Sequence, residues 1–236
     1  MNKTGWIIFI AAVVVLLGGL VVWARISNPP IDLSGIENNS VVTASTQNGN
    51  IGDHVKGSDA NKVILVEYGD YQCPSCGGAH PGINTIMEEY GDNVTFIFRN
   101  FPLTSIHPNA RAGASAAEAA GLQGKFWEMH DMLYENQGDW SNADAKKRLD
   151  VFNGYATTLG LDVEKFKTDF AAQPVNEKIK FDMALGKSVG TQATPTFFLN
   201  GEKLDDTTSS ELVKGNLDPI KEKLDALVPK ADTSKE

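Results

Sequence analysis

Several features that mark common classes of protein are missing from this 236-residue sequence. It contains no internal repeat and no glycine-rich loop of the kind that cradles phosphates. Its 21 basic residues are outnumbered by 30 acidic ones, which gives a formal net charge of -9. A nucleic-acid-binding surface carries an excess of positive charge. The composition therefore argues against nucleic acid as a partner.

Cysteine is also scarce, since the only two in the chain are Cys73 and Cys76, separated by Pro74 and Ser75. A disulfide between residues this close closes a very small loop, and in the chain-entropy model stabilisation grows with loop length, so a purely structural bridge would contribute little. A metal site is the second alternative, because Cys76 and His80 share one helix face, but no fourth ligand is obvious nearby. These limits favour redox chemistry, and we predict no metal ligands.

The cysteine pair lies where a strand is expected to end and a helix to begin. Residues 63–66 form an apolar, β-branched run typical of a buried strand, and a helical pattern follows from Cys76 to about Tyr90. Pro74 suits the first turn of a helix, where its missing N–H costs nothing, and this places Cys73 at the N-cap. A thiolate at Cys73 would face free backbone amides and the positive end of the helix dipole, which lowers its pKa and raises its reactivity.

Two separated stretches of the sequence resemble one known family. EYGDYQCPSC at residues 67–76, followed by GTQATPTFFLNG at 190–201, resembles the DsbA-like thiol:disulfide oxidoreductases of the thioredoxin superfamily. The membrane-anchored bacterial and archaeal subgroup is nearest, because its middle section also resembles FRNFPL at 98–103, HPNA at 107–110 and GKFWEMH at 124–130. The resemblance covers roughly residues 55–227. It implies an α/β, thioredoxin-like fold with an inserted helical subdomain.

The family resemblance also implies roles for individual residues. Cys73, nearer the surface, would form a mixed disulfide with a substrate thiol, and the deeper Cys76 would complete or reverse the exchange. Glu67 would be a buried acid that serves proton transfer to Cys76, with a pKa raised by desolvation. Pro195 would be cis and lie against the cysteine pair, so that Thr194 presents its backbone to a bound peptide as an added strand.

The dipeptide Pro74-Ser75 between the cysteines departs from the strongest oxidants of the family, which resemble Cys-Pro-His-Cys. Ser75 brings a hydroxyl and no cation, so we expect a milder oxidant. Asp70 nearby is expected to push the pKa of the thiol upward. The prediction is an enzyme that forms disulfide bonds in secreted or surface proteins without a cofactor. Its partners would be reduced or unfolded substrate proteins and a quinone-linked membrane protein that re-oxidises it.

Two alternative functions stay open on the sequence. One is a disulfide reductase or isomerase with the same fold, supplied with electrons by a membrane protein. The other is a tethered binding or chaperone module, with metal binding as one option, whose thiols do not turn over.

The N-terminal region is expected to anchor the protein in a membrane. Residues 6–24 form an uncharged apolar run about long enough to span a bilayer as one helix. We expect residues 1–5 in the cytoplasm and the catalytic domain outside, where an oxidising compartment allows disulfides to form. A cleaved signal peptide is the alternative. Residues 25–60 are rich in Asn, Ser, Gly, Thr and Pro, which predicts a flexible linker. Val41-Val42 and residues 51–55 are candidates for a short edge strand within it.

The remaining sequence, residues 61–228, is predicted to form the domain, with helices inserted over about 105–189. Asn200-Gly201 is a strong hairpin signal, and a capping box at 208–211 predicts the start of a final helix that breaks at Pro219. Residues 229–236 are predicted to be a disordered tail.

Four other polar residues are expected to be structural or solvated. His107 and His130 lie in the predicted insertion and are interpreted as structural. His54 is interpreted as a solvated loop residue. Arg99 is interpreted as a solvated residue at a strand end, with pairing to a buried carboxylate as the alternative.

Overall fold

The computed structural model describes residues 3–27, 30–58 and 60–228, so the predicted disordered tail at 229–236 lies outside the described residues. The chain divides into two compact units, with the boundary between Ser34 and Gly35.

The N-terminal unit contains one long helix, α1 (Lys3–Ser27). Within it, the stretch Lys3–Trp23 has a mean hydropathy of 2.8 and is long and apolar enough to cross a membrane. Large apolar side chains from Trp6 to Trp23 are exposed on this helix. The helix therefore has the length and composition expected of the membrane span predicted at 6–24.

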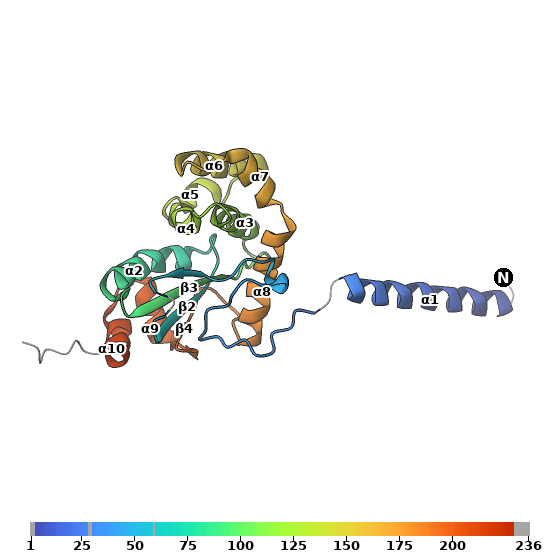
Figure 1. The fold of residues 1–236 in the computed structure, drawn as a ribbon. Coiled ribbons are helices and arrows are strands. Elements are labelled where there is room, and N and C mark those ends of the chain that lie inside the picture. The colour runs from blue at the N-terminus through green and yellow to red at the C-terminus, as the bar shows by residue number, and fades with distance from the viewer. Residues whose placement is uncertain (1–2, 28–29, 59, 229–236) are drawn as a thin grey trace, which may run out of the picture. The chain divides into compact units, whose positions relative to one another are not determined.

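The second unit is organised around a five-stranded sheet in the order β1-β3-β2-β4-β5 (Figure 1). The strands are β1 (His54–Lys56), β2 (Val63–Gly69), β3 (Val94–Asn100), β4 (Thr196–Leu199) and β5 (Glu202–Lys203). β2 and β3 run parallel, with Val63 opposite Val94, whereas the other neighbouring pairs are antiparallel. This mixed sheet confirms the predicted α/β, thioredoxin-like fold class.

The two central parallel strands are nearly continuous apolar runs because both of their faces are covered. All seven residues of β3 are buried, as are six of the seven in β2. Helix α2 (Pro74–Tyr90) connects the two strands. It begins where the sequence predicts, with Cys73 at the N-cap and Pro74 in the first turn.

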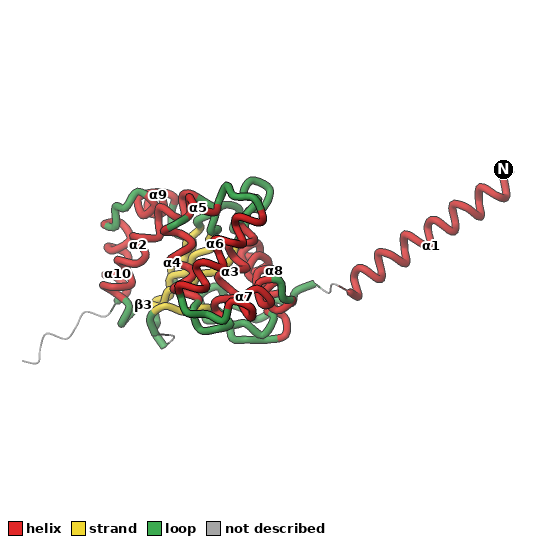
Figure 2. Tube along the Cα trace, turned by 90° about the horizontal axis from the view of Figure 1, so that it is seen from above, coloured by secondary structure: helices red, strands yellow, loops and turns green. Residues whose placement is uncertain are grey.

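Six helices lie between β3 and β4, where the helical insertion is predicted. They are α3 (Ala110–Gly121), α4 (Phe126–Glu135), α5 (Gln137–Trp140), α6 (Ala145–Thr158), α7 (Val163–Phe170) and α8 (Gln173–Ser188). Helices α3 to α7 gather on one side of the sheet in Figure 1, and Figure 2 shows helices around the strands from a second direction. Alanine-rich α3 approaches its neighbours closely, because a Cβ at Gly113 would lie only 2.8 Å from Cβ of Tyr71.

The two faces of the sheet pack against different helices. Leu65 and Phe98 belong to the main apolar core, which they share with residues of α2, α3 and α4. Tyr68 packs against α8 instead, since a Cβ at Gly186 would lie 2.9 Å from its ring and 2.8 Å from that of Phe101.

The predicted hairpin is confirmed at Asn200-Gly201, which connects β4 to β5. Both residues have positive φ angles, 50° at Asn200 and 84° at Gly201, as the tight two-residue turn requires. The last two helices are α9 (Asp206–Val213) and α10 (Asp218–Leu227). Pro219 lies in the first turn of α10, so the predicted break is also confirmed.

The predicted start of the last helical segment, at the capping box 208–211, is wrong. Helix α9 begins earlier, with Asp205 as its N-cap. The Asp205 carboxylate accepts hydrogen bonds from the backbone N–H of Thr208, at 2.9 Å, and from its hydroxyl, also at 2.9 Å. A charged aspartate is a strong N-cap and also favours the positive end of the helix, which moves the start upstream.

The structure differs from the predicted flexible linker at 25–60. The chain belongs to the folded unit from Gly35 onward, and β1 pairs antiparallel with β3, close to the candidate edge strand at 51–55. A 3-10 turn (Thr46–Asn48) also forms in this segment. Polar groups of the 35–58 segment bind buried partners instead of water. Arg99 donates to the backbone oxygen of Ser40 at 2.8 Å and to Oδ1 of Asn38 at 3.0 Å.

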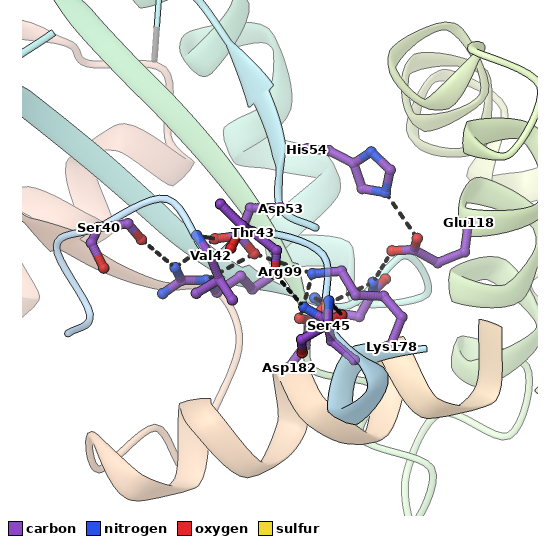
Figure 3. A network of polar contacts seen from close by, with 12 residues as sticks. Ser40, Val42, Thr43, Ser45, Asp53, His54, Arg99, Glu118, Lys178 and Asp182 are labelled. Atoms are coloured by element: carbon purple, nitrogen blue, oxygen red, sulfur yellow. Dashed lines mark hydrogen bonds and ion pairs between the residues drawn. The ribbon is translucent and has the colours of Figure 1, made fainter. Parts of the chain in front are cut away.

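A buried charge network holds the 35–58 segment on the sheet (Figure 3). Arg99 and Asp53 form a fully buried ion pair at 2.7 Å, and Lys178 lies 3.1 Å from Asp53 and 2.7 Å from Asp182. Burial alone would raise the pKa of Asp53, but the charges of Lys178 and Arg99 outweigh it and lower the pKa to about 2. The interpretation of Arg99 as solvated is therefore wrong.

His54 is not a solvated loop residue either. Its Nε2 lies 2.8 Å from the buried carboxylate of Glu118 on α3, and its ring stacks on Phe126 with 3.5 Å between ring centroids. Composition alone could not indicate these partners, because Glu118 is 64 residues away in the sequence.

Candidate active site

The turn between β2 and α2 fixes the position of both cysteines. Cys73 donates its backbone N–H to the carbonyl of Asp70 at 3.0 Å, and Gln72 donates its backbone N–H to Oδ1 of the same residue at 2.8 Å. The carbonyl of Cys73 then accepts the N–H of Gly77 at 3.1 Å as α2 begins. Both cysteines are free thiols.

The thiol of Cys73 is strongly acidic. A hydrogen bond from Cys76 is the largest cause, and with further hydrogen bonds from Thr194 and from the backbone amides of Ser75 and Cys76 it outweighs partial burial. Together these groups lower the pKa of Cys73 to about 5. Cys73 is therefore a thiolate at neutral pH, as its N-cap position predicts.

Cys76 has the opposite character. Only 1% of its surface is exposed, and its Sγ accepts the backbone N–H of Asp70 at 3.5 Å. Burial raises its pKa well above the ordinary value, and the hydrogen bond to Cys73 and the charge of Glu67 add to this effect. The pair thus consists of one thiol that ionises readily and one that holds its proton.

Glu67 is buried on β2 beside this pair, as the family resemblance implies. Burial raises the pKa of its carboxyl to about 8, and the negative charge of Cys73 contributes, while a hydrogen bond with Cys76 acts in the other direction. Its Oε1 has no hydrogen-bond partner among the described residues. A buried acid with a pKa near neutrality can exchange a proton with Cys76 at physiological pH.

Glu67→Gln is expected to stabilise the protein at alkaline pH. The pKa of Glu67 is about 8 in the folded protein against an ordinary 4.5. Stability linked to this group is therefore full below pH 4.5 and is lost as the pH rises through 8. Glutamine does not ionise, so the unfolding free energy of the variant, measured by urea denaturation, should fall less between pH 5 and pH 9, by on the order of 3 kcal/mol.

The exposed Glu202 of β5 provides the control for this experiment. Glu202→Gln should show the same change in unfolding free energy between pH 5 and pH 9 as the natural sequence. If the unfolding free energy of Glu67→Gln changes between pH 5 and pH 9 as much as that of the natural sequence, burial does not raise the pKa of Glu67.

The segment before β4 lies against the cysteine pair, as the resemblance implies. The Thr194-Pro195 peptide bond is cis, and Sγ of Cys73 lies 3.3 Å from the carbonyl oxygen of Thr194. Thr194 and Pro195 are half-buried, and Gln192 and Ala193 are exposed. The structure therefore brings Thr194 next to the reactive sulfur while leaving the preceding chain accessible to a peptide.

Asp70 has a structural role that the sequence does not predict. Its Oδ2 accepts the backbone N–H of Leu103 at 2.9 Å and lies 2.8 Å from Nδ1 of His107. The carboxylate thus ties the cysteine turn to the loop that follows β3. The expected upward effect of Asp70 on the thiol does not determine its pKa, because hydrogen bonds lower the pKa of Cys73 to about 5.

Gln137 is a second residue that sequence analysis misses. Its side-chain amide donates to the carbonyl of Tyr71 at 2.8 Å and to that of Cys73 at 3.0 Å. Helix α5 of the insertion therefore supports the cysteine turn directly. A single glutamine carries no pattern that could indicate this contact 64 residues away.

The metal site considered for Cys73, Cys76 and His80 is not the cluster that the structure forms. Among the described residues, the ligand group that contains His80 consists of His80, His130 and Asp131, without either cysteine. His80 is buried in α2, with Nε2 at 3.2 Å from the amide of Asn84.

Comparisons with known proteins agree with this geometry. The thioredoxin family model matches residues 49–218. BdbD from Bacillus subtilis superposes with a TM-score of 0.63 at 24% identity, over 79% of this chain and 97% of that one. The thiol-disulfide exchange protein alpha-DsbA2 from Wolbachia pipientis gives a TM-score of 0.59 at 19% identity, over 74% and 87%. A thioredoxin-like oxidoreductase from Silicibacter pomeroyi gives 0.55 at 26% identity, over 68% and 90%.

Curated relatives match the chain over only part of their length. The Na(+)/H(+) antiporter NhaA 1 of Salinispora arenicola is 40% identical over 151 residues, which is 64% of this chain and 22% of that protein. The chain thus spans less than a quarter of this relative. The fold is shared with BdbD and with alpha-DsbA2. Because the family model covers well over half of the chain, the chain belongs to the thioredoxin family.

Proposed function

We propose that this protein forms disulfide bonds in other proteins outside the cytoplasm. The observation that carries the proposal is the low pKa of Cys73, about 5, beside the high pKa of Cys76. A stabilised Cys73 thiolate makes the reduced enzyme the favoured product, so its disulfide is readily donated. Ser75 supplies no cation, and the thiolate is stabilised by hydrogen bonds instead.

The exchange proceeds in two attacks. A substrate thiolate attacks Sγ of Cys73 in the oxidised enzyme, the Cys73–Cys76 bond breaks, and Cys76 leaves and takes a proton from Glu67. A second substrate thiolate then attacks the substrate sulfur of the mixed disulfide, and Cys73 leaves as a stable thiolate. The substrate loses two electrons and gains a disulfide, and the enzyme becomes reduced, with Cys73 as a thiolate and Cys76 as a thiol.

Substrate binding is assigned to the segment before β4. The backbone of Thr194, 3.3 Å from Sγ of Cys73, is available to pair with an extended peptide. Such pairing uses hydrogen bonds to the backbone of the peptide more than contacts with its side chains. It therefore suits reduced or unfolded proteins of varied sequence as substrates.

The cellular setting of the proposal rests on α1 and on the chemistry. The apolar stretch Lys3–Trp23 would anchor the protein in the membrane as a single span. The domain would face the extracytoplasmic side, where disulfides persist. The reduced enzyme then needs an electron acceptor, and a quinone-linked membrane protein would return it to the disulfide form.

The reduction potential of the cysteine pair tests the direction of the reaction. We expect a value at or above about -200 mV for the full chain in detergent, titrated against glutathione buffers, because the reduced form is stabilised by the Cys73 thiolate. The Cys73→Ser/Cys76→Ser protein, which cannot form the disulfide, gives the signal expected in this titration when no redox change takes place. A value near about -270 mV would overturn the oxidase and favour the reductase alternative.

A further inference from the structure

A second group of polar side chains lies between α2 and α4 and has no part in the proposed exchange. It consists of His80 on α2 with His130 and Asp131 on α4, and one ligand atom from each lies within 4.8 Å of the others. Nε2 of His80 lies 3.5 Å from Oδ1 of Asp131. The cluster therefore connects the cysteine helix to the helical insertion.

Both imidazoles are in the state that a metal ion requires. His80 is 5% exposed and His130 is 3% exposed. Burial is the main cause that lowers the pKa of His80 to about 4 and that of His130 well below its ordinary value. Both rings are thus neutral at physiological pH, and a neutral imidazole has one ring nitrogen with a free lone pair.

The orientation of His130 is fixed from outside the cluster. Its Nδ1 lies 3.0 Å from the hydroxyl of Tyr71. Nε2 is therefore the ring nitrogen that could bind an ion. A hydrogen bond to the far nitrogen is the usual way in which proteins orient a metal-binding histidine. Tyr71 also belongs to the cysteine turn, so the cluster is coupled to the redox pair through one side chain.

Asp131 supplies the negative charge of the cluster. Its Oδ1 is buried and has no hydrogen-bond partner among the residues that the structure describes. The side chain is nevertheless 33% exposed, so an ion can reach it from solvent. An unpaired carboxylate oxygen facing two neutral imidazoles is a polar arrangement that a cation would complete.

We propose that His80, His130 and Asp131 form a zinc site that joins α2 to the helical insertion. Two imidazoles and one carboxylate are a common protein ligand set for Zn²⁺, with a fourth position taken by water. Tetrahedral bonds of about 2.0–2.2 Å place ligand atoms about 3.4 Å apart. The contact of His80 with Asp131, at 3.5 Å, already has this spacing. All three ligand atoms lie within 4.8 Å of one another, so binding an ion requires them to move closer by about 1 Å.

Lys56 opposes the ion and gives the proposal a distinctive test. Its Nζ donates to Oδ1 of Asn84 at 2.8 Å, and the amide of the same asparagine lies 3.2 Å from Nε2 of His80. Zinc at His80 replaces that amide contact and brings a second positive charge close to Lys56. Removing this ammonium should therefore strengthen the binding of zinc. A zinc ion bound elsewhere on the surface would not respond to this change.

The experiment uses the full chain in detergent with Cys73→Ser and Cys76→Ser, so that no thiolate competes for the ion. Zn²⁺ is titrated against a chelating dye, and Co²⁺ is added separately to record the visible absorption of a tetrahedral site. We expect one equivalent of Zn²⁺, with affinity lowered at least about tenfold in Asp131→Asn and in His80→Gln. Lys56→Gln should raise the affinity.

His107→Gln is the matched control, because this histidine lies outside the cluster and should leave zinc affinity unchanged. Asp131→Asn keeps the experiment decisive if His80→Gln fails to fold, since Asp131 is half-exposed. Absence of saturable Zn²⁺ binding in the cysteine-free protein would overturn the proposal. So would an affinity that Asp131→Asn and Lys56→Gln both leave unaltered.

Discussion

Replacing Cys76 by serine is expected to convert a transient mixed disulfide into a stable one. In this variant the Cys73 thiolate keeps the hydrogen bonds from Thr194 and from the backbone amides of residues 75 and 76. The serine hydroxyl can replace the hydrogen bond from the lost thiol, so Cys73 still reacts with an oxidised partner. The chain contains no other cysteine that could resolve the product. Turnover in thiol oxidation should therefore fall by at least about a thousandfold, as expected when one member of a catalytic unit is removed. The adduct is detected by non-reducing electrophoresis and by mass spectrometry of the intact protein.

Cys73→Ser is the matched control, because it leaves the other thiol in place. Cys76 is buried and its pKa is raised well above the ordinary value, so this variant should form no adduct at neutral pH. Equal adduct formation by both variants would contradict the division of roles between the two sulfurs. A natural sequence that shows no exchange at all would instead support a binding module whose thiols do not turn over.

The site could be predicted largely from sequence because its main signals are local. Pro74 after Cys73 indicates a helix start, and the structure has Cys73 at the N-cap with a low thiol pKa. Asn200-Gly201 indicates a turn by the backbone angles that these two residues tolerate. The placement of Glu67 and Pro195 near the cysteines came from family resemblance, since neither residue is close to Cys76 in a recognisable local pattern.

The rest depended on contacts between distant parts of the chain. A polar segment is expected to be exposed to solvent unless its polar groups find buried hydrogen-bond or ion-pair partners. The 35–58 segment has such partners in β3 and α8. Lys178 reaches Asp53 across 125 residues of sequence. His80 shows the same effect at the proposed zinc site: helical spacing places it near Cys76, but only the packing of α4 supplies His130 and Asp131.

The ion pair between Arg99 and Asp53 places a strong demand on stability. Both side chains are fully buried, and burial of an ion pair is favourable only when further hydrogen bonds satisfy both groups. Arg99 meets that condition through Asn38, Ser40 and the hydroxyl of Tyr68, which lies 3.2 Å away. The guanidinium therefore holds the 35–58 segment and the sheet together.

Arg99→Met is expected to lower the free energy of unfolding by about 3–5 kcal/mol, because it leaves the buried carboxylate of Asp53 with Lys178 as its remaining cation. Lys178 is already shared with Asp182, so it compensates only in part. Urea denaturation of the full chain in detergent measures this loss. Limited proteolysis should also show faster cleavage within residues 35–50, since their anchor is removed.

Two further variants separate the buried pair from ordinary surface charge. Lys146→Met breaks an exposed ion pair with Asp150, whose side chains are 88% and 63% exposed, and should not change stability measurably. Arg99→Met combined with Asp53→Leu removes both buried charges, and should be more stable than Arg99→Met alone because no carboxylate is left uncompensated. If the double variant is instead the less stable, the loss in Arg99→Met arises from missing packing and hydrogen bonds, and the charge of Asp53 is not its cause.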